Sequence, residues 1–190
     1  LLSKIFGVFI VIIFGLMLMI PSLFSEEIEE IIEKKANESL VTKLDFSSTE
    51  VTFFRHFPSL TFSIDEVSLK ESGDKKTGDL LTAKEIYFKI NIVKLLFRDE
   101  VKINGVVIDE ANFNFKKDKS GLSNYNVYNE VNQAKKKPDS TTTQNSDLFL
   151  EIDEFIIKNS DLVYEDQSTK IKIKATDFDL KGDGSFILKD

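Results

Sequence analysis

The chain has 190 residues, of which 42% are hydrophobic and 30% charged, so it carries enough apolar material for a folded core and is not a generally disordered sequence. Its formal net charge is −7, which argues against sequence-independent nucleic-acid binding, because that binding needs a basic surface. The sequence has no cysteine and one histidine, His56. This excludes disulfides, zinc–thiolate sites and cysteine nucleophiles.

The chain begins with an uncharged, strongly apolar segment over residues 5–25. As a helix rising about 1.5 Å per residue, this segment reaches about 30 Å, the thickness of a bilayer core. Lys4 precedes it, and several glutamates follow it before Lys34, so the positive-inside rule places the N-terminus in the cytoplasm. We therefore predict a single-pass anchor over residues 1–25. Its membrane residues are Ile5, Phe9, Ile13, Leu16 and Ile20.

A cleaved signal peptide is the alternative interpretation of the same segment. Its apolar region would normally be about 7 to 15 residues long and would end in an A-x-A pattern. Ser22-Leu23-Phe24-Ser25 does not supply that pattern, and no cysteine follows for lipid attachment. The uncleaved anchor is therefore the preferred prediction.

Residues 26–39 are predicted to form a short amphipathic helix. Ser25 can cap its first turn, and glutamates follow at the positive end of its dipole. An apolar stripe recurs at helical spacing in Ile28, Ile31, Ile32 and Ala36. We expect this stripe to pack on the first strands or to continue the membrane helix, with a partner-binding helix as the alternative.

From Leu40 onward, apolar and polar residues alternate, which is typical of strands with one apolar face. Turn signals at residues 71–74, 77–79, 118–121 and 158–161 separate these strands. The pattern predicts a mainly β fold: a curved, groove-like, mostly antiparallel sheet. Its first unit spans residues 40–128 and its second spans 148–190, with a disordered polar loop at 129–147. Residues 91–97 break the alternation and are predicted to form one helical turn.

One local pattern, apolar–polar–acidic–apolar, recurs within the strands and shifts the phase of the alternation by one residue. It occurs at residues 64–67, 83–86, 108–111, 152–155 and 175–178. Such slips predict β-bulges or strand corners, because otherwise the apolar side chains would change face. We also interpret residues 108–115 and 152–157 as corresponding strands of an internal repeat. The paired acids recur without a companion base, so we predict no catalytic site there.

Several segments, in this order, resemble the AsmA family of membrane-anchored proteins of diderm bacteria. After the anchor come Phe57-Pro58-Ser59-Leu60, then residues 80–88 leading into Val93-Lys94-Leu95-Leu96. Residues 101–109 follow, then Asp118-Lys119-Ser120-Gly121-Leu122-Ser123-Asn124, and last residues 156–166. The resemblance covers nearly the whole chain, although family members usually continue further. It implies a groove-shaped sheet with an apolar concave face, held at the inner membrane with its bulk in the periplasm and related to bridge-like lipid-transfer proteins.

A large exposed apolar surface usually marks a binding site. Acyl chains suit such a surface, since each buried methylene contributes about 0.8 kcal/mol without a directional polar contact. We therefore predict a protein that carries membrane phospholipids between the inner and outer membranes, without enzymatic activity, cofactor or metal. The groove candidates are Phe62, Ile64, Val67, Leu69, Ile86, Phe88, Ile103, Phe113, Phe115, Ile152 and Phe155.

Two alternatives remain open from the sequence. The strands alone are equally compatible with a closed sandwich or barrel whose faces meet as an ordinary core. The second alternative is a scaffold or regulator of outer-membrane protein targeting and assembly, a role also associated with the family. Such a scaffold would bind envelope proteins through exposed edge strands.

Overall fold

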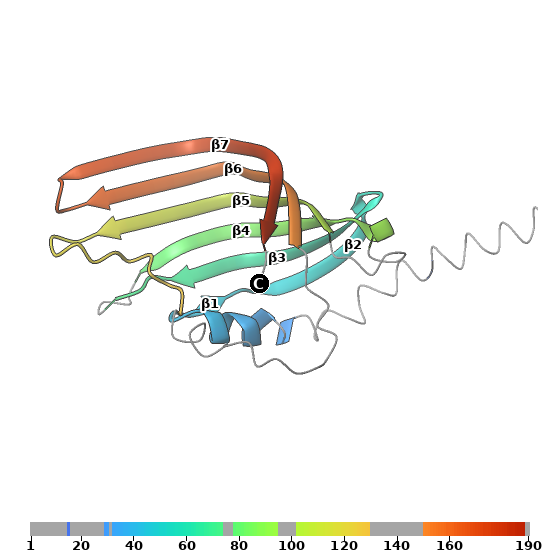
Figure 1. Cartoon of the computed structure of the whole chain (residues 1–190), viewed down its shortest axis with the longest axis horizontal. Coiled ribbons are helices and arrows are strands. Elements are labelled where there is room, and N and C mark those ends of the chain that lie inside the picture. Colours follow the sequence, from blue (N-terminus) through green and yellow to red (C-terminus); the bar gives the residue numbers. More distant parts are fainter. Residues whose placement is uncertain are drawn as a thin grey trace, which may run out of the picture.

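The computed structural model describes residues 15, 29–30, 32–73, 78–94, 102–129 and 150–188, and its strands form one seven-stranded sheet (Figure 1). The strands are β1 (Leu44–Asp45), β2 (Ser48–His56), β3 (Ser59–Lys70), β4 (Asp79–Ile90), β5 (Lys102–Lys117), β6 (Leu150–Asp166) and β7 (Ile171–Leu188). The long strands arise where apolar and polar residues alternate, because one face of the sheet is apolar and the other is wet.

The strand order is β1-β3-β4-β5-β6-β7, and β2 also pairs with β3, beyond the short β1. Every pairing is antiparallel except that of β5 with β6, which is parallel. The predicted mainly β, mostly antiparallel sheet is therefore confirmed. No pairing among the described strands joins β7 to β1 or β2, so this sheet is open, and the closed barrel is not the observed arrangement.

The helix predicted over residues 26–39 is confirmed where it is described, at residues 29–30 and 32–39. It lies along the edge of the sheet at β2: the backbone N and Oγ1 of Thr49 both donate to Glu29 Oε1 at 3.1 Å. At its other end, Asn129 N donates to Ser39 O at 2.8 Å. Residues 92–94 form the short helical turn predicted within residues 91–97.

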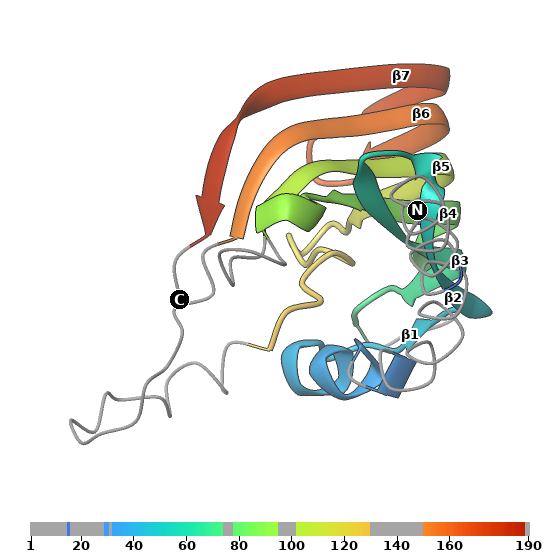
Figure 2. The ribbon, with the colours of Figure 1, turned by 90° about the vertical axis from the view of Figure 1, so that its right-hand side faces the viewer.

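The apolar face of the sheet is its concave face. Figure 2 shows the sheet bending toward the side that carries the N-terminal helix and the segment of residues 118–129. Thr49, which contacts that helix, lies opposite the apolar Ile64 in the β2–β3 register. Likewise, Tyr125 of the 118–129 segment packs edge-on against Phe115, with ring centroids 5.8 Å apart. Both contacts place the apolar side chains on the inside of the curve.

Four non-glycine residues in the left-handed region mark the places where the alternation changes phase. They are Glu66 in β3, Glu110 in β5, Asn159 in β6 and Asp177 in β7, with φ of 49°, 48°, 51° and 51°. The change occurs at the same level in neighbouring strands, since Ile64 lies opposite Ile86 and Val67 opposite Ala83. The predicted irregularities around residues 66, 110 and 177 are thereby confirmed, and a register shift of β6 against β7 lies at residues 152–154. We call these four residues the left-handed row.

One turn prediction is wrong, and the strand register places the two segments that were interpreted as repeats. Residues 158–161 do not form a turn, because β6 runs through them without interruption and Asn159 adopts its left-handed conformation inside the strand. The two strands interpreted as repeats are neighbours in the sheet, but Ile108 lies opposite Ile157, whereas Ile152 lies opposite Ile103. Their acidic pairs therefore sit at different levels.

The predicted membrane anchor lies outside the described residues, as do its candidates Ile5, Phe9, Ile13, Leu16 and Ile20 and most of the predicted 129–147 loop. Within the part of the chain that the structure describes, no helix combines the length and the apolar character needed to cross a bilayer.

Candidate functional site

Strand pairing brings all of the predicted groove candidates onto the concave face, because residues directly opposite one another in a sheet share a face. The register forms cross-strand rows: Phe62 with Phe88, Val106 and Phe155; Ile64 with Ile86, Ile108 and Ile157; Val67 with Ala83 and Ala111; Leu69 with Leu81, Phe113 and Leu162. Two further rows join Ile103 to Ile90 and Ile152, and Phe115 to Tyr164. Because the whole sheet changes phase at the left-handed row, the apolar face continues across it.

Aromatic rings contact one another along these rows. Phe62 and Phe88 stack with centroids 5.9 Å apart, and Phe113 and Phe115 stack at 6.1 Å. Phe113 also meets Phe178 of β7 at 6.4 Å. The described part of the face is therefore lined mainly by hydrocarbon over many strands, with Tyr164 and Thr49 as polar side chains within its rows.

The burial of this face changes across the sheet. Val67 and Ile103 are buried, and the remaining candidates are half-buried. Leu44 and Phe46 pack against the cluster around Val67, near the β1 edge. At the β7 edge, in contrast, Ile173 and Leu180 are 53% and 51% exposed. Among the described residues, the apolar face is thus covered near β1 and open toward β7.

Several residues of this face were not predicted from the sequence. They are Val106, Ile108, Ile157, Leu162 and Leu180, which join the candidates only through the strand register. The alternation of apolar and polar residues could have identified them. However, the phase change at the left-handed row lies between Ile157 and Leu162, so strict alternation would put these two residues on opposite faces. Knowledge of that row would have assigned both to the same face.

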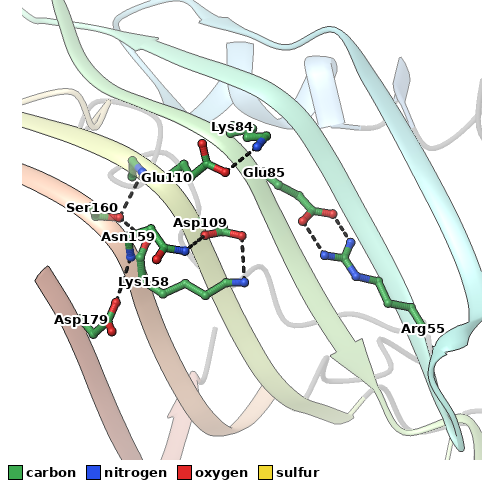
Figure 3. A network of polar contacts seen from close by, with 10 residues as sticks. Arg55, Lys84, Glu85, Asp109, Glu110, Lys158, Asn159, Ser160 and Asp179 are labelled. Atoms are coloured by element: carbon green, nitrogen blue, oxygen red, sulfur yellow. Dashed lines mark hydrogen bonds and ion pairs between the residues drawn. The ribbon is translucent and has the colours of Figure 1, made fainter. Parts of the chain in front are cut away.

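Three acidic residues of the recurring pattern, Glu85, Asp109 and Glu110, form ion pairs with basic residues of neighbouring strands (Figure 3). Glu85 pairs with Arg55 through the two terminal guanidinium nitrogens, and Glu110 pairs with Lys84. Asp109 Oδ2 lies 2.8 Å from Lys158 Nζ. Burial by itself would raise the pKa of Asp109, but hydrogen bonds from Lys158 and Asn159 outweigh it, and the pKa lies below its usual value. Cross-strand ion pairs therefore account for these three carboxylates.

Glu154 occupies a similar position near the other end of β6. It lies between two lysines, with Lys89 Nζ at 3.1 Å and Lys181 Nζ at 2.9 Å. Hydrogen bonds from Lys181 and Lys89 lower the pKa of its carboxyl group. Its neighbour Gly105 leaves room for it, because a Cβ at residue 105 would come 3.2 Å from Glu154 Oε2. Cross-strand charge pairing thus accounts for this acid as well.

The single histidine, His56, packs the end of β2 against the convex face. The His56 ring stacks on Tyr87 with centroids 5.2 Å apart, and Nδ1 lies 2.9 Å from Thr61 Oγ1. The Arg55 guanidinium carbon lies 4.5 Å from the centre of the same Tyr87 ring. Burial, together with the positive charges of Lys89 and Arg55, lowers the pKa of His56. Among the described residues, no group of His, Asp or Glu side chains is arranged to hold a metal ion.

The described fold is an open sheet with one hydrocarbon-lined concave face and one ion-paired convex face, a class of β protein that offers an apolar surface. The sequence profile of the AsmA family matches residues 2–185, and the chain belongs to this family. Comparisons with curated proteins and with solved structures give no match.

Proposed function

We propose that this protein is anchored in the inner membrane, with its N-terminus in the cytoplasm and its bulk in the periplasm, and that its concave face carries phospholipids toward the outer membrane. Acyl chains would lie against the apolar rows while the headgroups stay in water. No covalent chemistry or cofactor is part of the proposal. Family membership is compatible with this role.

The observation that carries the proposal is the continuity of the apolar face from β3 to β7, with exposure that rises toward β7. An ordinary core would bury Ile173 and Leu180, which are 53% and 51% exposed. Burying about ten methylenes of an acyl chain would contribute about 8 kcal/mol. That free energy corresponds to binding in the micromolar range, which suits a carrier that must also release its cargo.

The size of the sheet supports a carrier that works with other elements. Six strands follow one another across the sheet, and a spacing of about 4.8 Å between neighbours gives a width of about 24 Å. This is less than the thickness of one bilayer core, about 30 Å. A continuous path between two membranes would therefore need further strands or partners.

Substitutions at the open edge test the proposal with little risk to folding. Ile173→Glu and Leu180→Glu place a charge on the exposed part of the apolar face. Lys174→Glu is the matched control, because Lys174 is the exposed neighbour of Ile173 on the opposite face. We expect both apolar-face variants to lose most of the lipid that co-purifies with the chain, measured by mass spectrometry, and the control to retain it. Unchanged lipid in both apolar-face variants would refute the proposal.

A scaffold for outer-membrane protein assembly is the second candidate function. It is favoured by the outer edge of β7, which pairs with no described strand and offers a long row of backbone groups for a client strand. A photo-crosslinker at residue 180 would report on the concave face, and one at residue 179 on the convex side of the same edge. Crosslinks to lipid from residue 180 support transport, whereas protein crosslinks from both positions support the scaffold.

A further inference from the structure

Two turns with exposed apolar side chains meet at one end of the sheet. The turn between β2 and β3 carries Phe57, which is 75% exposed, and the helical turn after β4 carries Val93, which is 57% exposed. Pro58 of the first turn and Val93 of the second line the same shallow hollow of about 250 Å³. Leu60 lies opposite Ile90, so strand pairing holds the two turns together (Figure 1). We call this end of the sheet the hairpin tip.

The aromatic ring at the tip is exposed by the architecture of β2. His56 is turned onto the convex face by its stacking on Tyr87 and its contact with Thr61. Arg55 is held beside it by Glu85. The next residue, Phe57, therefore projects beyond the last paired residues, His56 and Ser59. A rigid apolar projection with charged and polar residues behind it is the arrangement of a side chain that sits at a membrane interface.

The N-terminal helix points toward this end. Its residue 39 contacts Asn129 at the far end of the sheet, and Glu29 contacts Thr49 near the middle of β2. The uncharged segment of residues 5–25 ends four residues before Glu29, so its end lies within about 14 Å of that residue. Thr49 and Phe57 are eight residues apart along β2, a reach of about 26 Å toward the tip. The reach from Thr49 to Phe57 is therefore longer than the reach from Glu29 to the end of the 5–25 segment. The hairpin tip can thus meet a membrane in which that segment is anchored.

From these observations, we infer that the hairpin tip inserts Phe57 and Val93 into the headgroup region of the bilayer that the 5–25 segment anchors. This inference rests on the anchoring part of the proposed function, but not on lipid transport. It gives the sheet a second attachment to the membrane and orients its tip end toward the lipid. The bilayer is the binding partner because the anchored 5–25 segment brings it within reach of the tip. Exposed Phe and Val side chains also gain free energy in hydrocarbon without the contacts of a specific protein partner.

The chain contains no tryptophan, so a single introduced indole reports on one position. We would prepare Phe57→Trp and Val93→Trp in the full chain and reconstitute each into vesicles of phosphatidylcholine and phosphatidylglycerol with brominated acyl chains. Leu122→Trp is the matched control, because Leu122 is 69% exposed and lies in the turn after β5, at the far end of the sheet. All three sites are open to solvent, so the substitutions leave the packed sheet intact.

Insertion to a depth of about 5–10 Å would bring the tip indoles near the bromine atoms and quench about half or more of their emission, whereas Leu122→Trp keeps its emission. Unquenched emission from either tip variant would overturn the inference. Equal quenching at Leu122, or failure of the chain to float with the vesicles, would overturn it as well. Lipid co-purification by the same variants is measured separately, so loss of transport with retained quenching refutes only the proposed function.

Discussion

Removing the hydroxyl of Ser160 is the most informative single perturbation of the sheet. The side chain is 0% exposed, and Oγ accepts a hydrogen bond from Ala111 N at 3.0 Å and donates one to Lys158 O at 2.7 Å. The β5–β6 register passes from the Asp109–Lys158 pair to the Asn112–Asp161 pair. The hydroxyl therefore supplies the partner that Ala111 N would otherwise find in the backbone of the neighbouring strand.

Ser160→Ala leaves this amide buried without a partner. An unsatisfied buried donor costs about 1–3 kcal/mol, so we expect the free energy of unfolding to fall by about 2 kcal/mol. For a chain of this size, each kcal/mol lowers the melting temperature by about 2–4 °C, which gives a decrease of about 4–8 °C. The measurement is thermal unfolding of the full chain in detergent, followed by far-ultraviolet circular dichroism.

Ser48→Ala is the control for this experiment. Its hydroxyl also donates a hydrogen bond, to Asp65 Oδ2 at 3.1 Å, but Ser48 is exposed and water can replace that partner. We expect a change within about 0.5 kcal/mol. If Ser160→Ala and Ser48→Ala had the same melting temperature, the Ser160 hydroxyl would not be replacing a backbone hydrogen bond between β5 and β6. Our account of the left-handed row would then be wrong.

Three further predictions concern single residues. Burial and nearby positive charges lower the pKa of His56, so the unfolded chain binds the proton more readily and the free energy of unfolding falls as the pH drops from about 7 to 5. In denaturant titrations, His56→Gln should flatten this dependence, and an unchanged slope would contradict it. Glu66 has a φ of 49°, so Glu66→Val should cost about 1–2 kcal/mol and Glu66→Asn almost nothing; equal melting temperatures would speak against strain. Hydrogen bonds from the Ser168 hydroxyl and from backbone amides lower the pKa of Asp166 to about 2, so its stabilisation is complete above the ordinary carboxyl pKa, about 4, and is lost as the pH falls through 2. Asp166→Asn should remove that acid-range dependence, and an identical acid titration in the variant would count against the assignment.

The strands were predictable where the alternation is strict. Phe62 and Ile64, or Ile86 and Phe88, are separated by polar residues because one face of β3 and β4 is apolar and the other carries charges. The phase slips of β3, β5 and β7 were also readable, because a polar–acidic or acidic pair interrupts the alternation at Glu66, Glu110 and Asp177. The strand register places the groove candidates on one face, while their binding of lipid remains a prediction.

The turn at residues 158–161 was mispredicted for a physical reason. Asn, Ser and Asp favour turns because they tolerate left-handed conformations and bond to nearby backbone groups. Here the same property serves a strand: Asn159 takes a φ of 51°, its Nδ2 donates to Asp109 Oδ1 at 2.8 Å, and its backbone N donates to Asp179 Oδ1 at 2.9 Å. The partners that decide between a turn and a bulge come from neighbouring strands, which a local pattern does not contain.

The direction of the curve and the parallel pairing of β5 with β6 were beyond the sequence. The parallel register depends on the long connection between Lys117 and Leu150, not on either strand's own pattern. The concave side is identified by contacts that lie outside the strands' own patterns, Tyr125 with Phe115 and Glu29 with Thr49. Alternation distinguishes two faces, but it does not say which one is concave.

The left-handed row also limits what can be added to the outer edge of β7. A newly arriving strand would have to kink opposite Asp177 to keep its oily residues on one side. A straight segment would place its apolar side chains on the apolar face along one half of its length and on the opposite face along the other half. The edge therefore admits strands bent in the same place and rejects the flat, regular segments that build fibrils, although β7 contains no proline.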